Sequence, residues 1–172
     1  DLVRSRGLGD VYKRQVKIPL YFMRKMNDGR GYDLDYYNLY LRRYLREYHF
    51  PEADDDLFIA SRAEAATNIY VASRLKGDEI FVSGELAIAG LLKGLEISPY
   101  DFVSEILADE FYDHISLEDE SIEFWTYTLL QELNSEFNDV ELCEEYLNTN
   151  EGVIFKLVIT GRIAEYFDEY GL

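Results

Sequence analysis

Residues 85–111 read ELAIAGLLKGLEISPYDFVSEILADEF, and this stretch decides the fold class. Its second half holds the clearest helix start in the chain, with Ser98 at the N-cap, Pro99 at the first helical position and Asp101 at the third. The apolar residues that follow share one helical face: Phe102, Val103, Ile106, Leu107 and Phe111. This half therefore predicts an amphipathic helix that begins at residue 99.

The first half of the stretch is apolar and rich in small residues. Its alanines and Gly90 allow a neighbouring helix to approach closely, because the distance between packed helices depends on the side chains at the contact. We predict a helix over residues 84–95 with Ser83 as its N-cap. The chain therefore reads as successive helices with short joints.

The three-to-four spacing of apolar residues extends outward from this stretch. It predicts further helices over about residues 33–49, 55–76, 117–137 and 151–170. The run Asp54-Asp55-Asp56 stands at the start of the second of these helices, where the helix dipole favours negative charge.

Two segments near the end of the chain need a choice between structures. Residues 153–160, VIFKLVIT, are rich in β-branched side chains, but their paired apolar positions fit a helix better than a strand. Residues 138–150 are polar and predict a loop, with a short turn near residues 141–146. We therefore predict an all-α, single-domain bundle of about six helices over residues 33–172.

The composition limits the classes of partner. The 172-residue chain has a formal net charge of −17, which disfavours direct binding to nucleic acid or to an anionic membrane and permits a basic protein partner. Cys143 is the single cysteine, so no internal disulfide forms and a reducing, cytoplasmic compartment is expected. No apolar run approaches the roughly 20 residues needed to span a bilayer.

Residues 1–15 differ from the rest of the chain because they are basic. They resemble a translated sequencing adapter, since Asp10 to Gln15 can be encoded by the transposon mosaic end used in library preparation. We therefore expect residues 1–15 not to be native and exclude them from the fold. Without their four basic and two acidic side chains the net charge becomes −19. Residues 16–32 are expected to be disordered or to contain the true start.

Several short motifs occur in a fixed order along the chain. They are Phe58-Ile59 with Arg62-Ala63, Glu85-Leu86-Ala87, Leu91 to Leu95, Ser98 with Tyr100-Asp101, and the terminal Gly171-Leu172. In this order they resemble the Bacteroidetes domain-of-unknown-function family eighteen-ninety-six, over about residues 33–172. The resemblance implies an all-helical cytosolic protein, often carried in mobile-element regions, with no known activity or catalytic residue. Ala108-Asp109 departs from the family pattern, in which Trp-Asn is frequent.

Two residues could take part in site chemistry. His114 follows Glu110 by four residues on one predicted helical face, but di-iron bundles use a spacing of three on two helices, so a solvated helix end is the better interpretation. Cys143 has no second cysteine to pair with, and an isolated, partly buried thiol is expected. We predict no catalytic residue, no cofactor and no metal ligand.

Helix 33–49 carries more tyrosine than one core face needs. Tyr36 and Tyr40 lie one turn apart beside the apolar stripe, and Arg43 follows. An exposed tyrosine and arginine patch would resemble an interaction hot spot, whereas the same residues could also cover the edge of the core. Tyr36, Tyr40 and Arg43 are therefore the candidate surface for a protein partner.

Three functions remain open from the sequence. The first is a non-enzymatic protein-interaction or accessory factor, which fits the acidic charge and the surplus of tyrosine. The second is an acidic mimic of DNA that opposes a DNA-binding or restriction protein, which requires carboxylates at phosphate-like spacing. The third is an enzyme, which requires a pocket with convergent polar groups. We favour the first, and the oligomeric state stays open.

Overall fold

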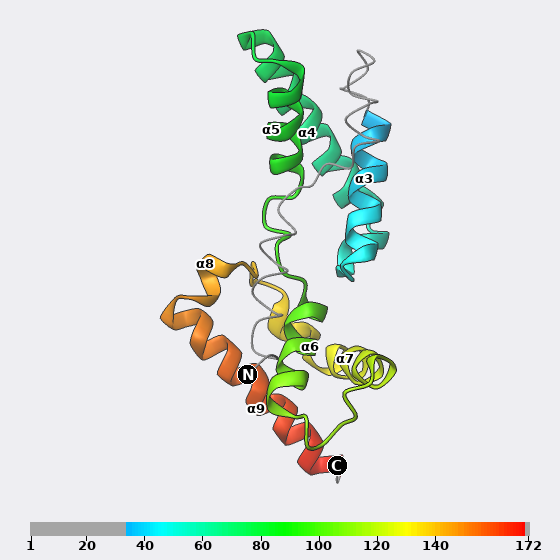
Figure 1. Cartoon of the computed structure of the whole chain (residues 1–172), viewed down its shortest axis with the longest axis vertical. Helices are drawn as coiled ribbons and strands as arrows, with labels where there is room; N and C mark the ends of the chain where they lie inside the picture. Colours follow the sequence, from blue (N-terminus) through cyan, green and yellow to red (C-terminus); the bar gives the residue numbers. More distant parts are fainter. Residues whose placement is uncertain (1–33, 171–172) are drawn as a thin grey trace. The chain divides into compact units, whose positions relative to one another are not determined.

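The computed structural model describes residues 34–170, and every regular element within them is helical (Figure 1). The predicted all-α class is therefore confirmed. The described residues contain seven α-helices and two short 3-10 helices, and the helix beyond the expected six is the short α8, Glu144–Leu147. The predictions for residues 1–15, residues 16–32 and Gly171-Leu172 lie outside the described residues.

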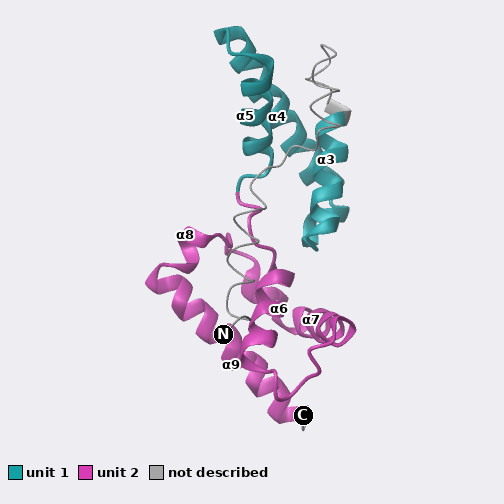
Figure 2. Cartoon of the chain, viewed as in Figure 1, with its two compact units in different colours: residues 1–93 teal, residues 94–172 magenta. Residues whose placement is uncertain are grey.

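The chain divides into two compact units, residues 1–93 and residues 94–172 (Figure 2). The single domain expected over residues 33–172 stays a prediction. Within the described residues, no helix is long and apolar enough to cross a membrane.

The first unit is built around one long helix that packs against two others. Its elements in chain order are α3 (Leu34–Glu47), η2 (Pro51–Asp54), α4 (Asp56–Lys76) and α5 (Ile80–Leu91). Helix α4 packs mainly against α5 and also against α3. The buried face of α4 includes the small residues Ala63 and Ala66, which let the neighbouring helices approach closely.

Helix α4 begins and ends where its local signals predict. The carboxylate of Asp55 accepts hydrogen bonds from the backbone amides of Leu57 and Phe58, at 3.0 and 2.9 Å. Asp54 and Asp56 instead form ion pairs with arginines of α3. Gly77 ends the helix with a φ of 95°, a conformation that glycine adopts without steric cost.

The predicted start of α5 at residue 84 is wrong. The helix begins at Ile80, and Ser83 lies fully buried inside it instead of capping it. The Ser83 hydroxyl donates to the Ser73 hydroxyl on α4 at 2.9 Å, and Ser73 donates to the Asp78 carboxylate at 2.6 Å. This chain of hydrogen bonds satisfies the buried hydroxyls, so a residue type favoured at caps is accommodated within the helix. The helix also ends at Leu91, four residues before the predicted end.

The second unit contains the remaining helices around one apolar core. Its elements are α6 (Pro99–Glu110), α7 (Asp119–Leu133), η3 (Asn134–Phe137), α8 (Glu144–Leu147) and α9 (Asn150–Tyr170). The predicted cap of α6 is confirmed, because the Ser98 hydroxyl accepts from the Asp101 amide at 3.0 Å. The predicted helix over 117–137 becomes α7 followed by the 3-10 helix η3.

Helix α9 forms one wall of this core. It buries Ile159, Ile163 and Phe167 against apolar residues of α6 and α7. The β-branched segment 153–160 is helical, as predicted from its paired apolar positions. Gly152 lies against α8, where a Cβ atom would stand 2.2 Å from the Tyr146 carbonyl oxygen, so only glycine fits at this contact.

Candidate protein-interaction surfaces

The structure places the tyrosines predicted as a partner site at the edge of the core of the first unit. The ring centroids of Tyr36 and Tyr40 lie 6.2 Å apart, and Tyr36 packs edge-on against Tyr37 at 5.1 Å. Tyr36 and Tyr40 are half-buried, whereas Tyr37 is fully buried. Arg43 is exposed and its guanidinium Nε lies 3.7 Å from the Glu47 carboxylate. The two rings therefore meet, but each offers only part of its surface to a partner.

The electrostatics of this group follow from its burial. Burial raises the pKa of the Tyr36 phenol well above its usual range, and Tyr40 adds to the rise. Burial also raises the pKa of Tyr37, with smaller contributions from Tyr36 and Tyr70. These phenols therefore stay protonated above the pH at which an exposed tyrosine ionises.

A second aromatic group lies in the other unit and presents more of its surface. Phe124 is 61% exposed and Tyr127 is 43% exposed, and both project from the same side of α7. The Tyr127 ring lies 5.1 Å from the ring of Tyr100 on α6. Phe124 is further held by edge-on contact with Trp125 at 5.2 Å. Two helices therefore support one exposed aromatic cluster.

Carboxylates surround this aromatic cluster. The pKa of the Tyr100 phenol is raised first by burial and then by nearby carboxylates, of which Glu123 contributes most. Burial and Glu123 also raise the pKa of Tyr127. Asp119 is a further carboxylate that acts on Tyr100. We call Tyr100, Asp119, Glu123, Phe124 and Tyr127 the acidic aromatic surface.

Apolar periodicity alone does not predict this surface, but the position of its aromatic residues on α7 does. The core stripe of α7 includes Leu129 and Leu133, which are buried. Phe124 and Tyr127 do not belong to that stripe, and they share their own side of the helix with Glu123. Large aromatic residues on the solvent side of an amphipathic helix are a mark of an interaction surface.

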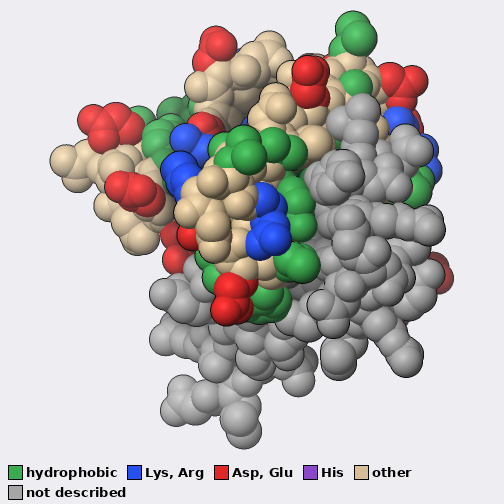
Figure 3. All heavy atoms as spheres, turned by 90° about the horizontal axis from the view of Figure 1, so that it is seen from above, with side chains coloured by type: hydrophobic (Ala, Val, Ile, Leu, Met, Phe, Trp, Pro, Cys, Tyr) green, Lys and Arg blue, Asp and Glu red, His purple; other side chains and the backbone are tan. Residues whose placement is uncertain are grey.

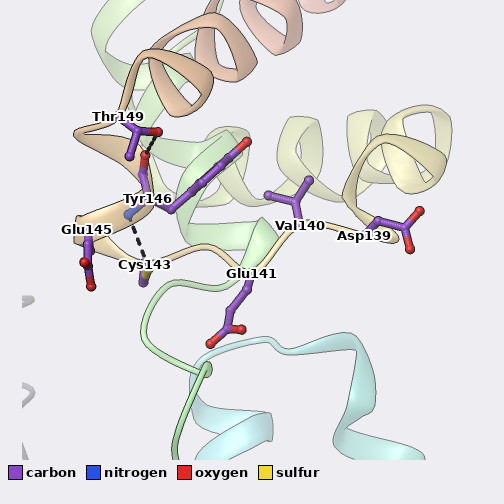
Figure 4. Close-up of a pocket in the computed structure, with 7 residues that line it drawn as sticks. All are labelled: Asp139, Val140, Glu141, Cys143, Glu145, Tyr146 and Thr149. Atoms are coloured by element: carbon purple, nitrogen blue, oxygen red, sulfur yellow. Dashed lines mark hydrogen bonds between the residues drawn. The ribbon is translucent and has the colours of Figure 1, made fainter.

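The second unit also contains a cavity of about 430 Å³ beside Cys143 (Figure 4). The Cys143 thiol is partly buried, as expected, and its sulfur accepts a hydrogen bond from the Tyr146 amide at 3.4 Å. The Thr149 hydroxyl donates to the Tyr146 carbonyl at 2.7 Å, so the polar groups serve the turn into α9. Asp139 and Glu145 lie at opposite ends of the lining in Figure 4 and do not converge on one point.

His114 does not share a helical face with Glu110, and its exposed position agrees with the solvated helix end that the sequence favours. Helix α6 ends at Glu110, and His114 lies in the turn that follows. Its imidazole stacks on the Phe167 ring at 6.0 Å with an interplanar angle of 11°. Across residues 34–170, no group of three histidine, cysteine or acidic side chains is placed to hold a metal ion.

Comparison with known proteins places this arrangement of helices in a family. The family model described as a domain of unknown function, DUF1896, matches residues 30–172. The chain belongs to the DUF1896 family. The resemblance inferred from the ordered motifs is thereby confirmed.

A solved structure shows the same fold as this DUF1896 protein. The crystal structure of protein PG0816 from Porphyromonas gingivalis, a member of the Bacteroidetes, aligns with a TM-score of 0.68. The two sequences are 24% identical, and the match covers 80% of this chain and 93% of PG0816. At this identity the likeness concerns the fold alone. A search of curated proteins found no match.

Proposed function

We propose that this DUF1896 protein is a non-enzymatic interaction or accessory factor that binds a basic segment of a protein partner at the acidic aromatic surface. It is expected to act in the cytoplasm, as an accessory factor of the kind encoded on mobile elements. The observation that carries the proposal is the exposure of Phe124 and Tyr127 next to carboxylates.

The chemistry of the acidic aromatic surface supports a partner with apolar and basic side chains. Aromatic residues are enriched among the anchors that supply most of the binding energy in protein interfaces. Carboxylates at the rim attract a basic partner and orient it during the encounter. Glu123 lies close enough to both phenols to affect their pKa, so the carboxylate and the aromatic rings can contact the same partner segment.

The charge of the whole chain supports a basic partner as well. The formal net charge is −17, so long-range attraction acts on any basic protein. The face of the molecule in Figure 3 carries acidic side chains interspersed with hydrophobic and basic ones, without a continuous acidic array. On the described part of this face, the layout does not offer the regularly spaced carboxylates that mimicry of a phosphate backbone needs.

Quantitative affinity capture tests the proposal. The full chain is the bait, and the lysate comes from a Bacteroidetes species such as Porphyromonas gingivalis. The test variant is Phe124→Ala with Tyr127→Ala, and the control is Leu75→Ala, which removes an exposed apolar side chain of α4. Because an interface hot spot contributes about 2 kcal/mol or more, we expect the double variant to retain the partner at least about 10-fold less well.

The identity of the captured protein separates the functions. A basic protein that is lost with the double variant and kept by Leu75→Ala supports the proposal. A DNA-binding or restriction protein that both variants retain equally would favour the DNA mimic. Equal capture of every protein by the wild type and the double variant would contradict the role of the acidic aromatic surface.

A further inference from the structure

The negative charge of the chain is concentrated in the second unit. Residues 94–172 contain 20 acidic and two basic side chains, a formal charge of −18, whereas residues 1–93 contain 14 acidic and 15 basic side chains. Both basic residues of the second unit, Lys156 and Arg162, lie on α9. Helices α6 and α7 therefore carry carboxylates without a cation of their own, and they attract a partner that supplies positive charge.

One side of α7 combines these carboxylates with aromatic rings. Glu120 precedes Phe124 by four residues, Glu123 precedes Tyr127 by four residues, and all four side chains are exposed. Their positions fall within an arc of about 100° around the helix. Because helical side chains lean towards the N-terminus, each ring lies over the turn that carries its carboxylate. This side of α7 therefore holds two successive pairs of one carboxylate and one ring.

The pair of Glu123 and Tyr127 also shows direct electrostatic coupling. Burial and then the Glu123 carboxylate raise the pKa of the Tyr127 phenol. The Tyr100 ring, 5.1 Å from the Tyr127 ring, covers one part of it, and 43% of Tyr127 stays exposed. A group that binds at this pair therefore meets an aromatic ring and a negative charge together.

The first unit contains an example of the group that satisfies both requirements. The guanidinium carbon of Arg62 lies over the Phe58 ring, 5.2 Å from its centroid, and one guanidinium nitrogen donates to the Lys93 carbonyl at 2.7 Å. A guanidinium thus covers a ring and donates to an oxygen acceptor at the same time. The ammonium group of lysine is compact and more strongly hydrated, so it is less suited to this double contact.

We propose that each pair of carboxylate and ring on α7 binds one arginine side chain of the protein partner. This inference rests on the proposed function, because it names the residue type recognised at the acidic aromatic surface and at the neighbouring Glu120. One guanidinium covers the Phe124 ring and donates to Glu120. The other covers the Tyr127 ring and donates to Glu123. Positions three residues apart on a helix have Cβ atoms about 5–6 Å apart, so the two arginines lie side by side on the partner.

Peptide titration of the full chain tests the inference. The probes are three short peptides in which glycine alternates with arginine, with lysine or with citrulline, which keeps the shape of arginine without its charge. NMR signals of ring-labelled phenylalanine and tyrosine report binding, and about 150 mM salt weakens long-range attraction. A cation over an exposed ring strengthens binding about two- to fivefold. We therefore expect the arginine peptide to bind at least about threefold more tightly than the lysine peptide, and the citrulline peptide to leave the signals unchanged.

Two sets of variants separate the ring from the carboxylate. Phe124→Leu with Tyr127→Leu keeps apolar side chains and removes the rings, so the preference for arginine over lysine should disappear. Glu123→Gln should weaken binding of the arginine peptide at least about threefold. The matched control Glu132→Gln removes an exposed carboxylate elsewhere on α7 and should change binding much less. Circular dichroism checks that each variant keeps its helices.

The outcomes distinguish this inference from the proposed function. Equal binding of the arginine and lysine peptides would overturn the inference and leave the proposed function standing, because a basic segment would still be bound. A preference for arginine that survives the loss of both rings would overturn it as well. If no peptide bound, arginine recognition would be wrong, and affinity capture with Phe124→Ala and Tyr127→Ala would decide the proposed function separately.

Discussion

Two groups of tyrosine in this molecule have different physical roles. On α3, Tyr37 is fully buried, the half-buried Tyr36 packs edge-on against it, and the half-buried Tyr40 lies beside Tyr36. On α6 and α7, Tyr100 and Tyr127 pair beside exposed Phe124. The rings of the first group are buried or half-buried, whereas Phe124 and Tyr127 of the second group are exposed. Residue type alone therefore does not identify a binding surface, and the helix side on which the aromatic residue lies is decisive.

The largest expected difference between the two groups concerns stability. Tyr37→Ala removes a fully buried aromatic side chain and should lower the free energy of unfolding by about 3–5 kcal/mol. Tyr127→Ala removes a partly exposed one and should change it by only about 0.5 kcal/mol. Urea unfolding, monitored by circular dichroism, measures the free energy of unfolding of each variant. Similar losses of unfolding free energy in Tyr37→Ala and Tyr127→Ala would contradict the distinction between a buried and an exposed tyrosine.

The response to alkaline pH gives a second test. The pKa of Tyr37 is raised by burial above its ordinary value of 10.0, so near pH 10 the unfolded chain releases this proton while the folded chain keeps it. The raised pKa of Tyr37 leaves the free energy of unfolding unchanged below about pH 10. Above that pH the free energy of unfolding falls by up to about 1.4 kcal/mol per pH unit, until the pH passes the folded-state pKa.

The matched variant for this test is Tyr37→Phe, which keeps the ring and removes the ionisable group. We expect the unfolding free energy of the variant to fall less steeply than that of the wild type above pH 10. Tyr127→Phe serves as the control on the exposed surface and should leave most of the slope unchanged. Identical slopes for the wild type and Tyr37→Phe would show that Tyr37 is not buried in solution.

The smallest expected effect concerns the carboxylate beside the exposed rings. Glu123→Gln removes a negative charge that acts on both Tyr100 and Tyr127, so the pKa of each phenol should fall towards its ordinary value. Tyr36 should keep its raised pKa, because burial is the main cause there. Titration of ring-labelled tyrosine by NMR resolves the separate groups. If Glu123→Gln lowered the pKa of Tyr36 as much as the pKa of Tyr127, the effect of Glu123 would not be local.

Much of the fold could be predicted because its signals are local. Asp55 and Ser98 cap their helices through amides two or three residues away, and Gly77 ends α4 by its own backbone conformation. Such signals need no knowledge of the rest of the chain. The all-α fold class, the family and most helix boundaries could therefore be predicted from the sequence.

The errors arose where contacts between helices decide the outcome. Ser83 has the side chain of a cap, but its hydroxyl is buried and donates to Ser73 on another helix. The contact between Tyr100 and Tyr127 was missed for a similar reason, since the two residues are 27 positions apart and meet only when α6 packs on α7. The predicted surface at Tyr36, Tyr40 and Arg43 stays a prediction.

Site-specific photo-crosslinking compares the two tyrosine groups most directly. A photoreactive phenylalanine analogue replaces Tyr127 in one full-length chain and Tyr40 in another, and each is irradiated in a Bacteroidetes lysate. The proposed function predicts that the chain labelled at position 127 cross-links to a discrete basic protein, and that Phe124→Ala weakens this cross-link. A discrete cross-link from position 40, with none from position 127, would contradict it and would return the partner site to α3.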